Sequence, residues 1–509
     1  MFENQPKALY ALALANTGER FGYYTMIAVF SLFLRANFGL SADTAGLIYS
    51  IFLGLVYFLP LIGGIMADKF GYGKMVTIGI IVMFAGYLFL SIPLGGGMVA
   101  FIAMLAALFL ISFGTGLFKG NLQVMVGNLY DTPELSAKRD SAFSIFYMAI
   151  NIGALFAPTA AVRIRDWAET SLGYSGNDAY HFSFAVACVS LIVSMMIYYA
   201  FRSTFKHVEA GAGKSKKANT AVAEEELTPQ QTKERIVALC LVFAVVIFFW
   251  MSFHQNGLTL TYFADEFVSP KAEGVQTMAF DVINLVMIIF MVYSAMSFFQ
   301  SKTSKAKLIS TVVFLAAVGV LVYKYNNIGG PVDVSAPIFQ QFNPFYVVAL
   351  TPVSMAIFGS LAAKGKEPTA PRKIAYGMIV AGSAYLLMVL ASRGLLTPNE
   401  QAAAKAAGEA VPFASGNWLI GTYLVLTFGE LLLSPMGISF VSKVAPPKYK
   451  GAMMGGWFVA TAIGNLLVSV GGYLWNDLPL TVVWSVFIVL CLLSAGFMFL
   501  MMKRLEKVA

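Results

Sequence analysis

Polar and charged residues interrupt the first long apolar stretch of the chain at helical spacing. Asn16, Glu19, Arg20, Tyr23 and Tyr24 recur at intervals that place them on one face of a helix. A charge in hydrocarbon costs about 2.5–3.5 kcal/mol, so this face should line an aqueous cavity. Neighbouring helical residues diverge by about 100°, so we predict that Glu19 and Arg20 do not pair with each other. The alternative is an internal pair that only fixes packing.

Two further charges stand alone in apolar stretches, one basic and one acidic. Lys119 lies within GTGLFKGNLQ, and Glu430 lies within FGELLLSPMG. Lone buried charges need partners, so an acid and a base on different helices predict an ion pair between two bundles. The alternative is that each charge meets a backbone carbonyl group or a water molecule separately.

A histidine also lies in an apolar stretch, where His254 precedes Gln255. Imidazole titrates near neutral pH and can carry a proton, but a lone membrane histidine is more commonly a hydrogen-bonded packing residue. The three histidines have no metal-ligand spacing, and the three cysteines each lie in an apolar run. These patterns predict no metal site and no disulfide framework.

The composition explains why polar residues in apolar stretches matter in this chain. Of its 509 residues, 58% are hydrophobic and 12% are charged, and the mean hydropathy is +0.74. Soluble domains carry about twice that share of charge. The composition therefore excludes a soluble enzyme, a disordered chain and a nucleic-acid binder, and indicates a polytopic helical membrane protein. We find no Ser/His/Asp set or phosphate loop, so we predict neither an enzyme nor a cofactor.

Apolar stretches of about 18 residues or more predict fourteen membrane-spanning helices. They lie near residues 8–35, 43–67, 75–94, 98–127, 141–162, 180–201, 234–257, 279–299, 308–325, 341–363, 374–392, 416–441, 451–474 and 480–502. With the N-terminus inside, 25 Lys and Arg residues fall in inner segments and 7 in outer segments, Arg163 and Arg165 among the latter. Basic residues accumulate on the cytoplasmic side, so we predict that both termini are cytoplasmic.

A polar stretch separates six of the predicted helices from the other eight. It contains GAGKSKKANTAVAEEELTPQQ, which is typical of a solvated linker. We therefore predict an all-α integral membrane protein with a six-helix bundle over 1–201, a cytoplasmic linker over 202–233 and a C-terminal bundle over 234–509. Two of the eight later helices exceed a six-plus-six plan and are expected to be an insertion.

Several segments resemble known families, in the same order along most of the chain. Residues 64–74, GIMADKFGYGK, match the G-x-x-x-D-[RK]-x-G loop of the major facilitator superfamily. Residues 19–24, ERFGYY, resemble the E-x-x-E-R-F-x-Y-Y signature of proton-dependent oligopeptide transporters. Further segments similar to that family are GTGLFKGN at 114–121, FYMAINIG at 146–153, FWMSFHQNGLTL at 249–260 and the stretch 429–465. The chain is thus identified as an atypical bacterial member.

The resemblance implies a major facilitator fold of two six-helix bundles plus two extra transmembrane helices at about 279–325. It also implies proton-coupled import of di- and tripeptides by alternating access. By position, Arg20 and Lys119 would attract the peptide carboxylate, and Glu430 would hold the peptide amine. The remaining substrate-binding residues that it implies are Tyr23, Tyr24, Tyr57, Asn151, Asn343 and Trp457. The residues assigned to proton coupling are Glu19, Glu430 and His254.

Among the positions that depart from the family pattern, three concern the outer gate and proton coupling. Asn16 replaces the first Glu of the helix 1 signature, Ile27 replaces a basic residue, and His254 replaces an acidic one. Losing both members of an acid–base pair leaves no uncompensated charge, so the double change is self-consistent. It predicts an altered outer gate and altered proton coupling. In one hypothesis, protonated His254 is drawn to a carboxylate such as Glu19; in the other, it is a neutral packing residue hydrogen-bonded within its own helix.

The leading hypothesis is therefore a peptide importer in a bacterial cytoplasmic membrane. Its expected partners are small peptides, protons and the lipid bilayer, without nucleic acid, and we expect a monomer. The main alternative is the same fold carrying another small substrate, such as a modified peptide, an anion or a drug. An exporter, a membrane sensor and a channel agree less well with the motifs and with the lack of an appended domain.

Overall fold

The computed structural model describes residues 5–132, 134–135, 139–210, 227–446 and 449–508. Their contacts divide the chain into two compact units. Unit 1 comprises Met1–His254, Val441–Tyr473 and Val508, and unit 2 comprises Gln255–Phe440, Leu474–Lys507 and Ala509. Each unit is described by itself below.

Unit 1 consists of long helices with two short 3₁₀ turns. Its elements are α1 (Lys7–Phe38), α2 (Ala42–Phe70), α3 (Tyr72–Leu90), α4 (Met98–Asn128), α5 (Arg139–Leu172), α6 (Tyr180–Ala200), η2 (Arg202–Thr204), η3 (Lys206–Val208), α8 (Pro229–Phe253) and α16 (Lys450–Leu466). The 3₁₀ turn η4 (His254–Gly257) and α17 (Ser469–Trp475) each run from unit 1 into unit 2.

Unit 2 adds one two-stranded ladder to its helices. Its elements are α9 (Thr259–Glu266), β1 (Lys271–Ala272), η5 (Gly274–Phe280), α10 (Val282–Gln300), α11 (Ser304–Asn326), β2 (Val332–Asp333), η6 (Ala336–Gln341), α12 (Phe342–Ala363), α13 (Ala370–Ala391), α14 (Pro398–Ala406), most of α15 (Asn417–Val444) and most of α18 (Leu480–Val508). The strands β1 and β2 pair in antiparallel register, with Ala272 opposite Val332.

The helices confirm the predicted spans. In the described part of the chain, 13 helical segments are long and apolar enough to cross a membrane, and they lie at thirteen of the predicted positions. The fourteenth position is α1, whose 32 residues include the polar face around Glu19 and Arg20 and are therefore less apolar. The extra pair at about 279–325 corresponds to α10 and α11.

Two predicted spans continue well beyond their predicted C-terminal ends. The helix predicted over 141–162 continues to Leu172 as α5, so Arg163 and Arg165 lie within a helix and not in an outer loop. The helix predicted over 234–257 passes through the 3₁₀ turn η4 and continues as α9 to Glu266. Both predictions ended the helix where charge or polarity increased, although the backbone stays helical beyond the apolar stretch.

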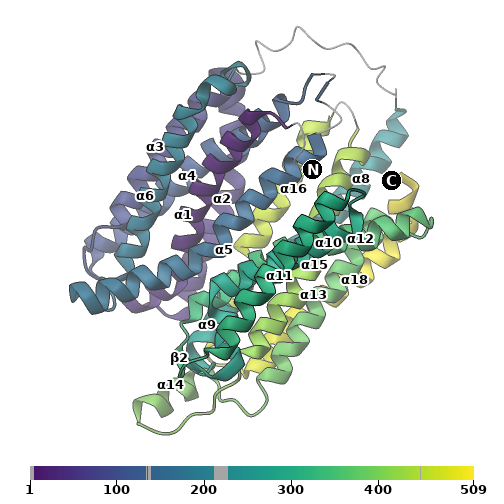
Figure 1. The fold of residues 1–509 in the computed structure, drawn as a ribbon. Coiled ribbons are helices and arrows are strands. Elements are labelled where there is room, and N and C mark those ends of the chain that lie inside the picture. Colours follow the sequence, from purple (N-terminus) through teal and green to yellow (C-terminus); the bar gives the residue numbers. More distant parts are fainter. Residues whose placement is uncertain (1–4, 133, 136–138, 211–226, 447–448, 509) are drawn as a thin grey trace. The chain divides into compact units, whose positions relative to one another are not determined.

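Close backbone contacts join the helices of unit 1. Helix α4 packs against α2 and α3, and α1 packs against α5 and α6 (Figure 1). A Cβ atom on Gly63 would lie 2.1 Å from the carbonyl oxygen of Gly116, so only glycine permits this approach of α2 to α4. Asn121 of α4 donates to the Gly63 carbonyl oxygen at 3.1 Å. These contacts fix the helix that carries Lys119.

Helices from distant parts of the sequence also meet inside unit 1. Helix α16 packs against α2 and α8, although more than 190 residues separate α8 from its partner α16. The predicted division into 1–201, 202–233 and 234–509 follows chain order and stays a prediction. Residues 211–226 of the predicted linker lie outside the described residues.

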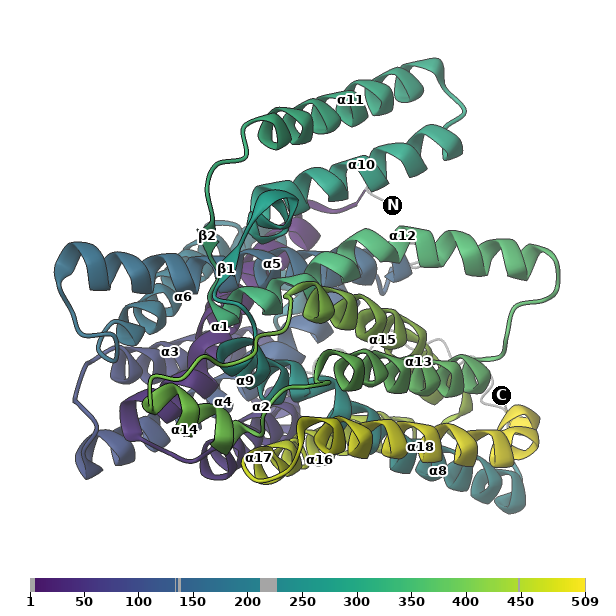
Figure 2. The same ribbon diagram turned by 90° about the horizontal axis from the view of Figure 1, so that it is seen from below.

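The inserted pair forms a helical hairpin at the edge of unit 2. Figure 2 shows α10 between α11 and α12, and both contacts of α10 are present in the structure. The ladder β1–β2 joins the two ends of the hairpin, because β1 precedes α10 and β2 follows α11. The hairpin is therefore attached to the unit at its base.

Candidate functional site

The predicted polar face of α1 is buried, and its two charges pair with each other. Glu19 is 1% exposed and Arg20 is 2% exposed. The Nε and Nη2 atoms of Arg20 donate to both carboxylate oxygens of Glu19. This corrects the prediction that adjacent residues do not pair. The helical angle fixes the direction of Cβ, but the long arginine stem lets its planar fork turn back onto its neighbour.

One aromatic ring packs against this ion pair, and further rings contact that ring. The Arg20 guanidinium carbon lies 4.5 Å from the centroid of the Tyr23 ring. The Tyr23 ring meets Tyr24 edge-on at 5.3 Å and stacks on Phe52 of α2 at 6.2 Å. The side-chain nitrogen of Asn16 is buried without a hydrogen-bond partner. The two tyrosines predicted to contact substrate therefore lie beside the charged pair of α1.

A second group of predicted residues meets within unit 1. The Lys119 ammonium lies 4.3 Å from the centroid of the Tyr57 ring, a cation–π contact between α4 and α2. The Tyr57 and His254 rings are tilted, with centroids 6.0 Å apart. The structure thus brings together a base, an aromatic ring and the unusual histidine of this sequence.

His254 has a partner that the sequence did not indicate. Its Nδ1 atom hydrogen-bonds the side-chain oxygen of Asn465 on α16, and its ring stacks on Trp250 at 5.2 Å. The packing interpretation placed this hydrogen bond within its own helix, so the partner on α16 corrects it. Asn465 is fully buried in an apolar span. A polar amide in such a span needs a hydrogen-bond partner, and this was the feature of the sequence that could have indicated Asn465.

The other two predicted residues of unit 1 belong to the packed interior of their helices. Asn151 of α5 is 7% exposed and donates to the Tyr147 carbonyl oxygen of its own helix at 3.0 Å. Trp457 of α16 is 3% exposed, and its carbonyl oxygen accepts from Thr461 at 2.9 Å. Their assignment to substrate binding stays a prediction.

In unit 2 the structure brings Glu430 and Asn343 together. The side-chain nitrogen of Asn343, at the start of α12, donates to Glu430 Oε2 at 2.9 Å and contacts Thr427 Oγ1 at 3.0 Å. Glu430 is 8% exposed on α15. Thr427 was not predicted, although its position three residues before Glu430 puts it on the same helical face. The hydrogen bond from Asn343 orients the Glu430 carboxylate.

The break between α8 and α9 is held by hydroxyl groups of unit 2. At η4 the carbonyl oxygen of Asn256 accepts from Thr261 Oγ1 at 2.9 Å and from the Tyr423 hydroxyl at 3.1 Å. Gln255, fully buried, accepts from Thr259 at 2.8 Å. These bonds satisfy backbone and side-chain groups that a helix break exposes in an apolar setting. Tyr423 lies seven residues before Glu430 on α15, so one helical face serves both the break and the carboxylate.

The predicted pair of Lys119 with Glu430 joins the two units, so it stays a prediction. Among the described residues, no group of three or more His, Cys, Asp or Glu side chains could hold a metal ion. Each unit contributes buried charges from membrane-length helices. Together with the fold, they define a multi-pass helical membrane protein whose helices bury charged groups.

Comparison with known proteins gives the family. The sequence model described as the POT family matches residues 73–223 and 310–482. The chain therefore belongs to the POT family.

Curated relatives align over nearly the whole chain. The uncharacterised transporter YclF of Bacillus subtilis is 28% identical, covering 99% of this chain and 95% of its own. The di-/tripeptide transporter of Lactococcus lactis subsp. cremoris is 28% identical over 92% of this chain and 89% of its own. Dipeptide and tripeptide permease A of Escherichia coli K12 is 26% identical over 92% and 84%.

Solved structures share the fold. A mutant of a peptide transporter POT in complex with alafosfalin has a TM-score of 0.73 and 22% identity, covering 100% of this chain and 96% of that one. A POT family transporter in complex with 5-aminolevulinic acid also has a TM-score of 0.73, with 20% identity and coverage of 100% and 98%.

Proposed function

We propose that this POT family transporter imports di- and tripeptides together with protons by alternating access. The observation that carries the proposal is the buried ion pair of Glu19 and Arg20. A carboxylate that accepts hydrogen bonds from two guanidinium nitrogens prevents that arginine from binding a second anion in the same way. Protonating Glu19 would remove the ion pair and free the guanidinium group. Proton uptake would thereby make a second cation available to the carboxylate of a peptide.

The proposed substrate is a zwitterion because unit 1 offers cationic side chains for a carboxylate and unit 2 offers a carboxylate for an amine. Lys119 in unit 1 would bind the peptide carboxylate, with Arg20 joining it after Glu19 takes up a proton. Glu430 in unit 2 would bind the peptide amine, oriented by its hydrogen bond from Asn343. Asn151 and Asn343 would bond the peptide backbone. Tyr23, Tyr24, Tyr57 and Trp457 would line the side-chain pockets. The names of two curated relatives support peptides as the substrate class.

The proton gradient would supply the energy for accumulation. One proton moving down a potential of 100 mV yields about 2.3 kcal/mol, enough for roughly fifty-fold accumulation of a peptide. We assign this proton to Glu19 and not to the other two predicted coupling residues, Glu430 and His254. The same proposal places the chain in a bacterial cytoplasmic membrane, as a monomer with both termini in the cytoplasm.

The substitution Glu19→Gln tests the proposal in liposomes containing the purified protein. Glutamine keeps the shape of the side chain but cannot take up the coupling proton. Uphill uptake of a labelled dipeptide driven by a proton gradient should be lost, whereas counterflow of the peptide should persist. Glu506→Gln is the matched control, because Glu506 pairs with Arg372 outside the proposed site. Unchanged proton-driven accumulation in Glu19→Gln would refute the assignment.

A second substrate class is favoured by the solved relatives. One of them binds 5-aminolevulinic acid and another a thioalcohol-conjugated peptide. Both ligand types suit a site with charged groups at its ends, so a modified peptide or another small zwitterion is the alternative cargo. Competition of each unlabelled compound with dipeptide uptake distinguishes the two. Failure of dipeptides to be taken up at all would favour the alternative.

A further inference from the structure

The hairpin α10–α11 leaves most of its apolar surface uncovered. Helix α11 packs mainly against α10 and η5. In the most apolar part of α11 only 11% of residues are buried, compared with 56% in α13 of the same unit. An apolar helix that other helices do not cover must be surrounded by hydrocarbon. The uncovered faces of α11 therefore contact lipid chains.

Both ends of the hairpin carry side chains that favour a membrane–water boundary. Tyr323 and Tyr325, near the C-terminus of α11, are 70% and 55% exposed, and Phe299, at the end of α10, is 82% exposed. Tyrosines concentrate at this boundary, and Phe299 adds apolar surface beside the lysines of the other end. The apolar segment from Leu308 to Val322 spans about 22 Å at 1.5 Å per residue. With lysine stems extending to the headgroups, this length suits a hydrocarbon core of about 30 Å.

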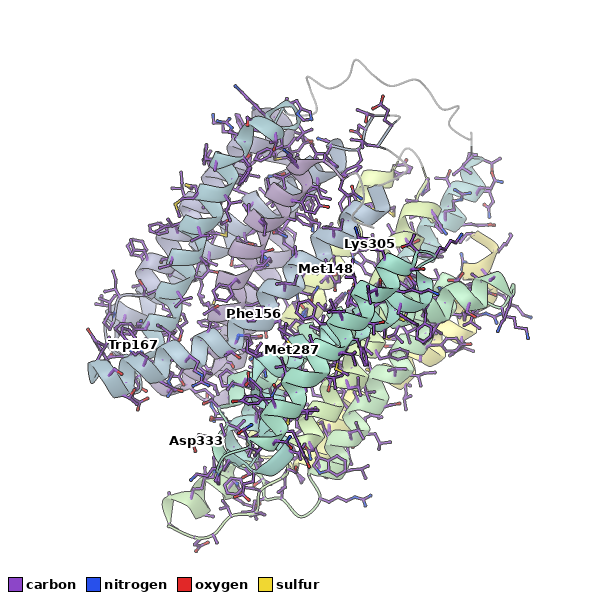
Figure 3. All side chains as sticks on the ribbon, in the orientation of Figure 1. Met148, Phe156, Trp167, Met287, Lys305 and Asp333 are labelled. Atoms are coloured by element: carbon purple, nitrogen blue, oxygen red, sulfur yellow. The ribbon has the colours of Figure 1, made fainter. Side chains whose placement is uncertain are left out.

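The base of the hairpin is fixed and electrically balanced. Asp281 caps α10 by accepting from the Ile283 amide at 2.9 Å, and it also pairs with Lys324 at the end of α11. The ladder β1–β2 lies at the same end. Figure 3 shows Asp333 at this base, Met287 along the hairpin and Lys305 at the opposite end. The tip is therefore held at a defined distance from the base.

The tip of the hairpin carries positive charges that no acidic residue nearby in the sequence balances. Lys302, Lys305 and Lys307 are exposed within six residues, and the sequence has no Asp or Glu between residues 282 and 332. Two other basic residues of unit 2, Arg372 and Lys373, pair with Glu506 and Glu367. Lysines next to an exposed phenylalanine and a lipid-covered helix lie where phospholipid headgroups are found.

From this arrangement we propose that the tip lysines Lys302, Lys305 and Lys307 bind the headgroups of anionic phospholipids in the surrounding bilayer. The apolar faces of α11 hold the tip at headgroup depth, and the lysines select lipids with a net negative charge. A basic residue near an anionic membrane surface contributes roughly a fivefold preference. Orientation during membrane insertion also uses lysines, but it requires no selection of lipid by the folded protein.

The test measures which lipids the folded, full-length protein retains. Purified protein is placed in a mixture of phosphatidylcholine and phosphatidylglycerol at low salt, and bound lipid is measured by native mass spectrometry. The wild type should retain phosphatidylglycerol preferentially. Lys302→Gln/Lys305→Gln should lower that preference by roughly fivefold for each lysine. Lys302→Arg/Lys305→Arg should keep the preference, because the charge is preserved.

The control is Lys364→Gln/Lys366→Gln, which removes two exposed lysines from the loop between α12 and α13 of the same unit. This variant should keep the wild-type preference. Equal loss in both double variants, or no loss in the hairpin variant, would overturn the proposal. Inorganic phosphate that displaces phosphatidylglycerol as effectively as added phosphatidylglycerol would show a phosphate site and also overturn it.

Discussion

The two units each bury a carboxylate in a membrane-length helix, but they stabilise it differently. In unit 1, Glu19 accepts two hydrogen bonds from Arg20 on the same helix. In unit 2, the Glu430 side chain accepts a hydrogen bond from the neutral amide of Asn343 on another helix. An ion pair within one helix cancels the charge locally. A neutral donor orients a carboxylate without cancelling its charge.

This difference explains how the two carboxylates can have separate tasks. A buried ion pair depends on both partners, because removing one leaves an uncompensated charge. A hydrogen bond from a neutral amide leaves the charge of the carboxylate unchanged, and a carboxylate attracts a cation such as an amine. Under the proposed function, Glu19 acts as the proton switch and Glu430 recognises the substrate amine.

Breaking the ion pair of unit 1 should have the largest effect. Arg20→Gln leaves Glu19 as a buried, unpaired charge, and the free energy of unfolding should fall by about 3–5 kcal/mol. Thermal unfolding of the purified protein in detergent measures the loss. Glu19→Gln/Arg20→Gln removes both charges and should recover most of the stability without restoring uptake.

Arg372→Gln is the control for that measurement. Arg372 is about half exposed and pairs with Glu506, so its loss should cost less than about 1 kcal/mol. Equal destabilisation by Arg372→Gln and Arg20→Gln would contradict the contrast between a buried pair and an exposed one.

A smaller effect is expected in unit 2, on ligand selection. An N-acetylated dipeptide lacks the charged amine and should bind the wild type much more weakly than the free dipeptide does. Glu430→Gln should reduce the ratio of the two affinities by roughly tenfold to a hundredfold. This factor corresponds to the free energy of a hydrogen bond to a charged group. Competition with labelled dipeptide measures both affinities. If Glu430→Gln weakens both ligands equally, Glu430 does not recognise the amine.

The smallest effect is expected at His254. Its hydrogen-bond partner in the structure is Asn465, a neutral amide, and not Glu19. His254→Gln keeps polarity and removes titration, so the dependence of uptake on pH should overlay that of the wild type from acid to neutral pH. A shifted profile would mean that the histidine takes up a proton during transport. Glu19 and Glu430 would then not account for transport alone, because His254 would be a third group that takes part in proton coupling.

The positions of the helices could be predicted from the sequence because hydrocarbon imposes a simple rule. A span needs about 20 apolar residues, and each of the fourteen predicted positions contains a long helix. The residues at which the helices end were less predictable. Hydropathy records where the apolar stretch ends, whereas α5 continues through Arg163 and Arg165 to Leu172. Backbone hydrogen bonding extends the helix beyond the lipid-facing segment.

The candidate residues were predictable as buried polar groups, but their partners were not. Sequence spacing describes where a side chain leaves its helix, not how far an arginine fork can turn, so the Glu19–Arg20 pair was missed. Asn465 was missed because it joins His254 across 211 residues of sequence. Asn343 and Glu430 were both predicted as binding residues, and their hydrogen bond emerged only from the packing of α12 against α15.

The contact of Gly63 with Gly116 has a consequence for inherited variation. Every single-base change in a glycine codon that alters the residue adds at least one carbon atom, and at Gly63 that atom would lie 2.1 Å from the Gly116 carbonyl oxygen. No substitution at Gly63 or Gly116 is therefore small enough to avoid a clash. A side chain at Gly63 would therefore force α2 and α4 apart, because the atom that it meets belongs to the backbone of Gly116 and no side-chain change on α4 can remove it.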